Sequence, residues 1–167
     1  MTLSSLSRLT TEYIEREDRL RISGETSNGT VVIWLTLRLT NRLMPLLLDW
    51  LTKQQAGEPY ADLLQGWAVR QARAGLEVQA PVRATPASEQ WLAEEVTVTR
   101  RSEAVILVFK GRDDSQRAQI TLAPTPLRQW LAIVHDLYAL AGWSRDVWPD
   151  WMLDSGPTAP TENIVWH

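Results

Sequence analysis

The sequence predicts an α+β fold: an antiparallel β-sheet or sandwich, with two short helices inserted between its strand groups and one helix at the C-terminal end. Two patterns predict it. Stretches in which polar and apolar residues alternate are typical of half-buried strands, and stretches with an apolar residue every three or four positions are typical of amphipathic helices. The composition fits a folded domain, because 44% of the 167 residues are hydrophobic and only 22% are charged.

The first strand group is a hairpin. Residues 19–25 alternate, with Leu20 and Ile22 on one side and charged or polar residues on the other. Asn28-Gly29 follows, and this pair favours a tight turn because both residue types tolerate positive φ. Residues 30–37 are rich in β-branched side chains and form the expected return strand.

Two helices are expected next. In the first, Thr40 or Asn41 caps the N-terminus, Pro45 lies near the first turn, and Gly57 ends the helix. Its apolar residues are Leu39, Leu43, Leu46, Leu47, Trp50 and Leu51. The second helix spans residues 61–74 and ends at a glycine. Its expected apolar side consists of Leu63, Leu64, Trp67 and Ala68.

The second strand group follows a crossing loop rich in alanine and proline at residues 76–90, in which 76–79 form one short expected strand. The later strands are expected within 91–101, at 104–110 and at 117–122, with a turn at 111–114. The strand at 104–110 is apolar on both faces, which indicates the centre of a sheet. In the last strand the inward residues are Ala118, Ile120 and Leu122.

A final helix is expected from Pro126, after a Thr125 N-cap, to Leu140, with Gly142 as its stop. Its apolar face consists of Leu127, Trp130, Leu131, Val134, Leu137 and Tyr138. These elements form one domain, residues 1–142, and residues 143–167 form an acidic, tryptophan-rich tail.

Residues 10–57 and 95–142 share a layout of three strands, a helix and a glycine stop. A few residues are identical at an offset of 85 positions, namely Thr36-Leu37 with Thr121-Leu122, Thr40 with Thr125, Leu46 with Leu131, and Ala56-Gly57 with Ala141-Gly142. Two interpretations stay open. The halves arose by duplication, or strand groups that each precede a capped helix look alike for generic reasons.

The order of the predicted elements is given by four segments. The hairpin is RLRISGETSNGTVVIWLTL, and the helix pair is LTNRLMPLLLDWL with PYADLLQGWAV. The later strands are EVTVTRRSEAVILVFKGRDDSQRAQITL, and the exit helix is TPLRQWLAIVHDLYAL. This order resembles the head domain of a superfamily of dimeric scaffolds, which includes the end-joining scaffold that partners DNA ligase and the centriolar cartwheel protein. The resemblance covers residues 10–142 and implies a scaffold role. The coiled-coil stalk of that superfamily has no counterpart, because Gly142 and then Pro149, Pro157 and Pro160 stop the exit helix.

The net charge and the residue types of the chain exclude several classes of function. The net charge of −3 argues against a protein that coats duplex DNA, and the lack of cysteine excludes a disulfide framework, a thiolate metal site and a cysteine nucleophile. No segment is apolar for long enough to span a membrane and no secretory signal opens the chain, so we expect a cytoplasmic protein. His135-Asp136 lacks further histidine ligands, and the spacing of Asp146, Asp150 and Asp154 is interrupted by a proline. We therefore expect no catalytic residue, no metal and no cofactor.

Tryptophan is the unusual feature, with nine copies against one phenylalanine. Five lie within predicted elements and are expected to pack in the core: Trp34, Trp50, Trp67, Trp91 and Trp130. The tail supplies the candidate partner-binding residues, which are Trp143, Trp148, Trp151, Met152 and Trp166. Either these side chains anchor in the groove of a partner, or the tail folds back on its own domain.

The sequence therefore favours a non-enzymatic protein–protein interaction module, an adaptor or assembly subunit, whose partner is another protein; a homodimer is left open. A single-stranded nucleic-acid-binding protein is the alternative, since arginine on strands beside aromatic rings suits unpaired bases. Its candidate residues are Arg19, Arg21, Arg100, Arg101, Lys110, Arg112 and Arg117. Most outward strand positions near them carry threonine or glutamine, which disfavours this alternative.

Overall fold

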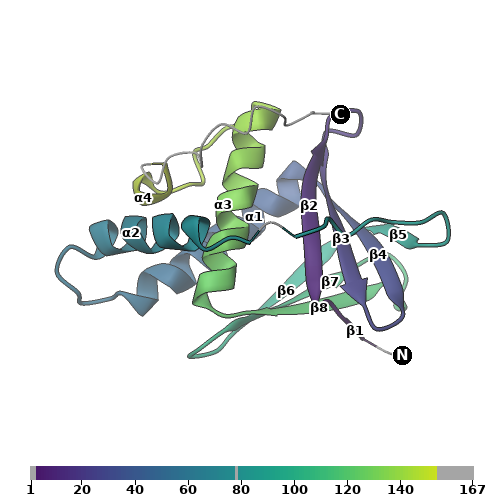
Figure 1. Ribbon diagram of the computed structural model, residues 1–167, viewed down its shortest axis with the longest axis horizontal. Helices are drawn as coiled ribbons and strands as arrows, with labels where there is room; N and C mark the ends of the chain where they lie inside the picture. The colour runs from purple at the N-terminus through teal and green to yellow at the C-terminus, as the bar shows by residue number, and fades with distance from the viewer. Residues whose placement is uncertain (1–2, 78, 154–167) are drawn as a thin grey trace.

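The computed structural model describes residues 3–77 and 79–153, which form an α+β fold with two four-stranded sheets and helices gathered to one side (Figure 1). The strands are β1 (Ser4–Ser5), β2 (Arg8–Ile14), β3 (Arg19–Thr26), β4 (Gly29–Leu35), β5 (Glu89–Leu92), β6 (Glu95–Arg100), β7 (Val105–Lys110) and β8 (Arg117–Leu122). The helices are α1 (Leu37–Gln54), α2 (Ala61–Ala74), α3 (Pro124–Ala141) and α4 (Asp150–Leu153). The predicted fold class is confirmed.

Each sheet is an antiparallel meander completed by one strand from elsewhere in the chain. The first has the order β2-β3-β4-β5 and the second β1-β8-β7-β6. Strand β5, which comes just before the second meander, pairs parallel with β4 of the first sheet. Strand β1, which comes just before the first meander, pairs parallel with β8 of the second. The two sheets thus exchange their outer strands, and both inner faces contribute to one hydrophobic core.

The first hairpin forms as the Asn-Gly signal predicts. Thr26 pairs with Gly29, whose φ of +126° is a conformation that favours glycine. The Thr26 hydroxyl donates to the Gly29 carbonyl at 2.9 Å and accepts from the Asn28 N–H at 3.2 Å. The turn therefore fixes the register in which Leu20 and Ile22 are fully buried.

Helix α1 begins earlier than expected. Thr36 is the N-cap, and its hydroxyl accepts from the Leu39 N–H at 3.2 Å, so neither Thr40 nor Asn41 caps the helix. Pro45 lies inside the helix and not near its first turn. It is exposed, so water can reach the carbonyl that a proline leaves without an N–H partner. The helix also ends before Gly57, at Gln54.

Helix α3 also starts before the predicted cap. Ala123 is the N-cap and Pro124 the first helical residue, so Thr125 lies within the first turn. The predicted C-terminal stop is confirmed, because Gly142 adopts a left-handed φ of +70°. The predicted apolar face is also confirmed, since all six of its residues are buried.

Between α2 and the second meander, one strand prediction is wrong and one is confirmed. Residues 76 and 77 are not in a strand, position 78 lies outside the described residues, and residue 79 is also irregular. The strand expected within 91–101 is confirmed as β6, which carries the alternating EVTVT residues. The same stretch also contains the end of β5, which belongs to the other sheet. Ala93 N–H still bonds to the Trp34 carbonyl, whereas Glu94 N–H bonds to that of Lys110, which marks the point where the chain changes sheet.

The two halves share the predicted layout of a three-stranded meander followed by a long helix. Helices α1 and α3 are both 18 residues long, but their ends lie 87 positions apart, not 85. With the offset of 85 positions, Thr36, which caps a helix, is aligned with Thr121, which lies within β8. These identities do not mark equivalent structural positions. The order of elements behind the resemblance to scaffold heads is present, and membership of that superfamily stays a prediction.

Candidate functional site

Helix α2 buries two long polar side chains beside Val69 and Ala72, and it exposes two large apolar ones. Gln65 and Arg73 are 1% and 6% exposed, whereas Leu63 and Trp67 are 49% and 52% exposed. The prediction that Trp67 packs in the core, on the apolar side of this helix, is therefore wrong. Tyr60, which precedes the helix with a left-handed φ of 60°, is 80% exposed.

The buried side of α2 meets polar partners on α3 and α1. The Arg128 Nη2 donates to Gln65 Oε1 at 3.3 Å, and Gln65 Nε2 donates to the Leu51 carbonyl at 2.5 Å. Gln129 Nε2 donates to the Ala72 carbonyl at 3.1 Å. These bonds satisfy polar groups that would be costly to bury unpaired, and they hold α2 in this orientation.

An ion pair closes the same interface. Both terminal nitrogens of Arg73 bond to the Asp136 carboxylate, at 2.8 and 3.1 Å, and only 5% of the Arg73 side chain is exposed. Burial opposes ionisation of Asp136, but its contacts with His135 and Arg73 outweigh that effect and hold its pKa below the ordinary value. The carboxylate is therefore charged at neutral pH, as the buried guanidinium requires.

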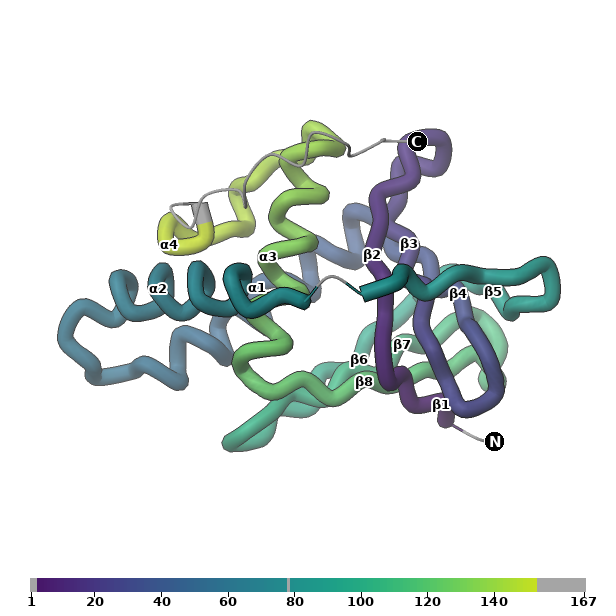
Figure 2. Tube along the Cα trace, in the orientation of Figure 1, coloured from purple at the N-terminus to yellow at the C-terminus, as the bar shows by residue number. Residues whose placement is uncertain are grey.

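The outer face of α2 carries an apolar stripe that we call the α2 stripe: Tyr60, Leu63 and Trp67. Leu63 and Trp67, at i and i+4, share one face of the helix. Tyr60 lies at the N-terminal end of that helix, where its carbonyl accepts from the Leu64 N–H at 3.0 Å. Figure 2 shows α2 at one extremity of the molecule, opposite the sheets. Large apolar side chains gathered on one exposed helix face are typical of a macromolecular contact surface.

The candidate partner-binding residues of the tail are placed differently. Trp143, Trp148 and Trp151 are 8%, 4% and 6% exposed, and Met152 is fully buried, all within the core of the same chain. The expectation that these four side chains are available to a partner is wrong, and the alternative, that this segment folds back, describes residues 143–153. Trp166 lies outside the described residues. The packed body therefore continues past the boundary predicted at residue 142.

Aromatic contacts hold this C-terminal segment in place. Trp143 meets both Tyr13 and Tyr138 edge to face, with ring centroids 5.5 and 5.2 Å apart, and its Nε1 donates to Asp18 Oδ1 at 3.0 Å. Trp148 meets Tyr138 at 5.3 Å and His135 at 5.1 Å in the same geometry. Edge-to-face pairs of this kind add to the stabilisation that burial of each ring gives.

Asp18 is the polar centre of that packing. The Tyr13 hydroxyl donates to its Oδ1 at 2.7 Å, and the bonds from Tyr13 and Trp143 lower the pKa of Asp18. The same hydrogen bond, with desolvation next in importance, raises the pKa of Tyr13 to about 12. This left-handed residue, with φ of 50°, thus ties the β2–β3 turn to the segment that follows α3.

The basic residues of the nucleic-acid alternative do not converge. Arg19 and Arg21 lie on β3, whereas the others belong to the second sheet or its turns, with Arg100 and Arg101 at one end of β6–β7 and Lys110, Arg112 and Arg117 at the other. Several are neutralised. Arg21 pairs with Glu12 at 3.1 Å, Arg100 with Asp49 at 3.4 Å, and Lys110 with Glu95 at 3.7 Å. Arg21 also lies over Trp34, 5.8 Å from the ring centroid.

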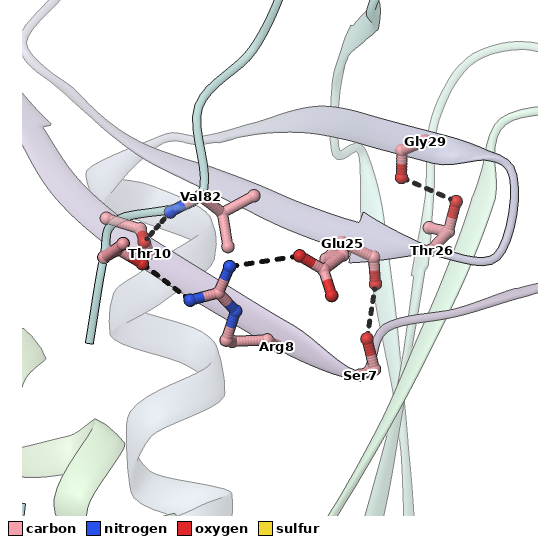
Figure 3. Close-up of polar contacts among 8 residues, drawn as sticks. Ser7, Arg8, Thr10, Glu25, Thr26, Gly29 and Val82 are labelled. Carbon is pink, nitrogen blue, oxygen red and sulfur yellow. Dashed lines mark hydrogen bonds and ion pairs between the residues drawn. The ribbon is translucent and has the colours of Figure 1, made fainter. Parts of the chain in front are cut away.

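A cavity of about 480 Å³ lies between β2, the end of α2 and α3. The chain that follows α2 lines one side of this cavity with residues 75–77, 79 and 80, and it is bound to β2 through Ala80 and Val82. Arg8 donates to the Ala80 carbonyl at 2.6 Å and pairs with Glu25 at 3.1 Å, and Val82 N–H donates to Thr10 Oγ1 at 2.8 Å (Figure 3). The polar ends of Arg8 and Gln129, which line the cavity, are thus engaged within the chain.

Within residues 3–77 and 79–153, no three histidine, aspartate or glutamate side chains gather closely enough to hold a metal ion. In the same ranges, no helix combines the length and the apolar character needed to cross a bilayer. Comparisons with protein-family models, curated proteins and solved structures find no match to this chain.

Proposed function

We propose that this chain is a non-enzymatic protein–protein interaction module that contacts its partner through the α2 stripe. The observation that carries the proposal is the orientation of α2, which buries Gln65 and Arg73 and exposes Leu63 and Trp67. The α2 stripe takes the place of the C-terminal tryptophans as the proposed contact surface, because Trp143, Trp148 and Trp151 are buried within the domain itself.

The energetics of α2 support the proposal. Covering apolar surface contributes about 25 cal/mol per Å², and a tryptophan offers on the order of 200 Å². Within the domain about half of this contribution is not realised at Trp67, because its side chain is 52% exposed. A partner that covers the α2 stripe would recover it, and tryptophan and tyrosine are enriched among the residues that dominate binding energy.

The α2 stripe also differs from scattered surface apolar residues. Leu3, which immediately precedes β1, is 40% exposed, and Figure 1 shows β1 on the side of the molecule away from α2. Isolated exposed leucines are ordinary on protein surfaces and need no functional explanation. This residue therefore offers a matched control for the α2 stripe.

The test is affinity capture from cells of the source organism with three forms of the full chain: wild type, Leu63→Ser/Trp67→Ser, and Leu3→Ser. We expect proteins, or further copies of this chain, that the wild type and the Leu3 variant retain and the α2 variant loses. Circular dichroism must show that all three are folded. If the same proteins bind all three forms, the α2 stripe is not the contact surface, and if nothing binds the wild type, the proposed function is wrong.

A further inference from the structure

The α2 stripe has a direction. Tyr60 lies at its N-terminal end, between Glu58 and Asp62, and Arg70 lies at its C-terminal end on the same outer face as Trp67. Arg70 is exposed and makes no ion pair within the described part of the chain. One end is thus aromatic and acidic and the other is cationic, with Leu63 and Trp67 between them.

A surface with this polarity is complementary to itself when it is turned around. A two-fold axis perpendicular to α2, passing midway between residues 63 and 67, places residue 63 opposite residue 67 of a second copy and residue 60 opposite residue 70. Leucine then meets tryptophan twice, and arginine meets a tyrosine ring flanked by carboxylates twice. From this, and resting on the proposed function, we infer that the partner of the α2 stripe is a second copy of this chain, with the two α2 helices antiparallel.

A parallel arrangement of the two α2 helices is disfavoured by the charges of the same residues. It brings Arg70 against Arg70 and places the acidic ends together, so that like charges repel at both ends of the contact. Antiparallel helices also align their dipoles favourably. The α2 stripe has three large side chains per copy, fewer than a standard interface supplies, so we expect a reversible dimer with a dissociation constant of the order of micromolar.

The first test is sedimentation velocity of the full chain over a wide concentration range. We expect the mass to rise from the monomer value of 19.0 kDa to twice that value. Trp67→Ser raises the dissociation constant by about a hundredfold, because each dimer loses two central aromatic contacts. Leu3→Ser, the matched control, leaves it unchanged. Thermal denaturation verifies that each variant is folded.

The second test addresses the pairing. Arg70→Glu weakens the dimer about tenfold, since it removes two cation–π contacts and places carboxylates beside acidic ends. The double variant Tyr60→Arg/Arg70→Glu restores opposite charges across the two-fold axis and recovers the affinity. A heterologous contact would gain nothing from that second substitution, so failure of the rescue would overturn the antiparallel pairing.

The third test measures orientation. The chain has no cysteine, so Ala74→Cys carries a single spin label on the exposed side of α2. Antiparallel helices separate the two labels by about 27 Å along the helix axes, because each residue rises ~1.5 Å. Parallel helices bring them within about 10 Å, the usual interaxial distance. A short distance, or a chain that stays monomeric at every concentration, overturns the inference.

These outcomes are separable from those of the proposed function. A monomeric wild type that captures another protein in an α2-dependent manner leaves the interaction module standing and refutes only the second copy. A dimer that survives Trp67→Ser shows that the copies meet elsewhere. A wild type that neither dimerises nor captures any protein refutes both.

Discussion

Two tryptophan-bearing segments of this molecule have similar composition and opposite placement. Residues 143–153 carry three tryptophans, all buried against the domain, whereas α2 carries Trp67 with half of its surface exposed. Residues 143–153 are acidic and interrupted by a proline, so their sequence predicts that they are exposed to solvent. Helix α2 has an apolar side, so its sequence predicts that Trp67 is buried in the core.

The difference lies in what each segment meets. Trp143 and Trp148 pack edge to face against the rings of Tyr13, Tyr138 and His135, and so complete an aromatic cluster. The inner side of α2 instead meets Arg128 and Asp136, which call for polar partners. An apolar face is buried only where the neighbouring element offers it an apolar surface, and α3 uses its own apolar face elsewhere in the core.

The largest effect expected from this comparison is at Trp148. Trp148→Ala should lower the free energy of unfolding by about 3–5 kcal/mol, because it removes a buried ring and leaves a cavity beside His135 and Tyr138. Urea denaturation followed by far-UV circular dichroism measures the change. A loss below about 1 kcal/mol, the typical effect of an ordinary substitution, would mean that the segment 143–153 is not part of the packed body.

The next effect concerns the ion pair between Arg73 and Asp136, which holds α2 in its orientation. Asp136→Asn should lower the free energy of unfolding by about 3 kcal/mol, since it leaves the buried Arg73 guanidinium without its carboxylate. The double variant Arg73→Met/Asp136→Leu should recover most of the loss, because it removes both charges. Equal destabilisation by the single and double variants would show that the ion pair does not position the helix.

A pH dependence should follow from the contact between Tyr13 and Asp18. Folding raises the pKa of Tyr13 from 10.0 to about 12, so the folded state holds the phenolic proton more tightly. This contribution to stability is complete below pH 10 and declines as the pH rises toward 12. Denaturation curves of wild type and Tyr13→Phe across this range provide the measurement, and equal slopes for the two proteins would contradict the assignment.

The smallest effect on stability is expected at Trp67. Trp67→Ala should change the free energy of unfolding by no more than about 0.5 kcal/mol, because the side chain is half exposed and its neighbours are not opened by its removal. Measured on a monomeric sample, its loss should also reduce the share of the tryptophan fluorescence that an aqueous quencher reaches. A loss comparable to that of Trp148→Ala would show that Trp67 belongs to the core.

Local signals predicted much of the fold. The Asn28-Gly29 turn defined the β3–β4 hairpin, Pro59 and Gly75 bracketed α2, and the apolar spacing of α3 identified its buried face. Each of these depends on residues close together in the sequence, through turn geometry or helical periodicity. Helix starts were less well predicted, because Thr36 and Ala123 cap helices whose caps were expected two to five residues later.

The candidate site was not predictable in the same way. Trp67 was correctly placed on one face of a helix together with Leu63, but its exposure depends on α3, more than fifty residues away. The buried positions Gln65, Val69, Ala72 and Arg73 also recur at helical spacing, and this was a signal that a second face of the helix is able to pack. The contacts with Arg128 and Asp136 on α3 decide which face of α2 is buried.

The sequence by itself determined the class of fold, the bounds of α2 and β8, and the alternation of β3, β6 and β8, because these arise from the geometry of neighbouring residues. The tertiary structure decided which strands cross between the two sheets, that the C-terminal tryptophans close the core, and that α2 shows its apolar side to solvent. Burial is a property of pairs of surfaces, and a pattern along the chain describes only one member of each pair.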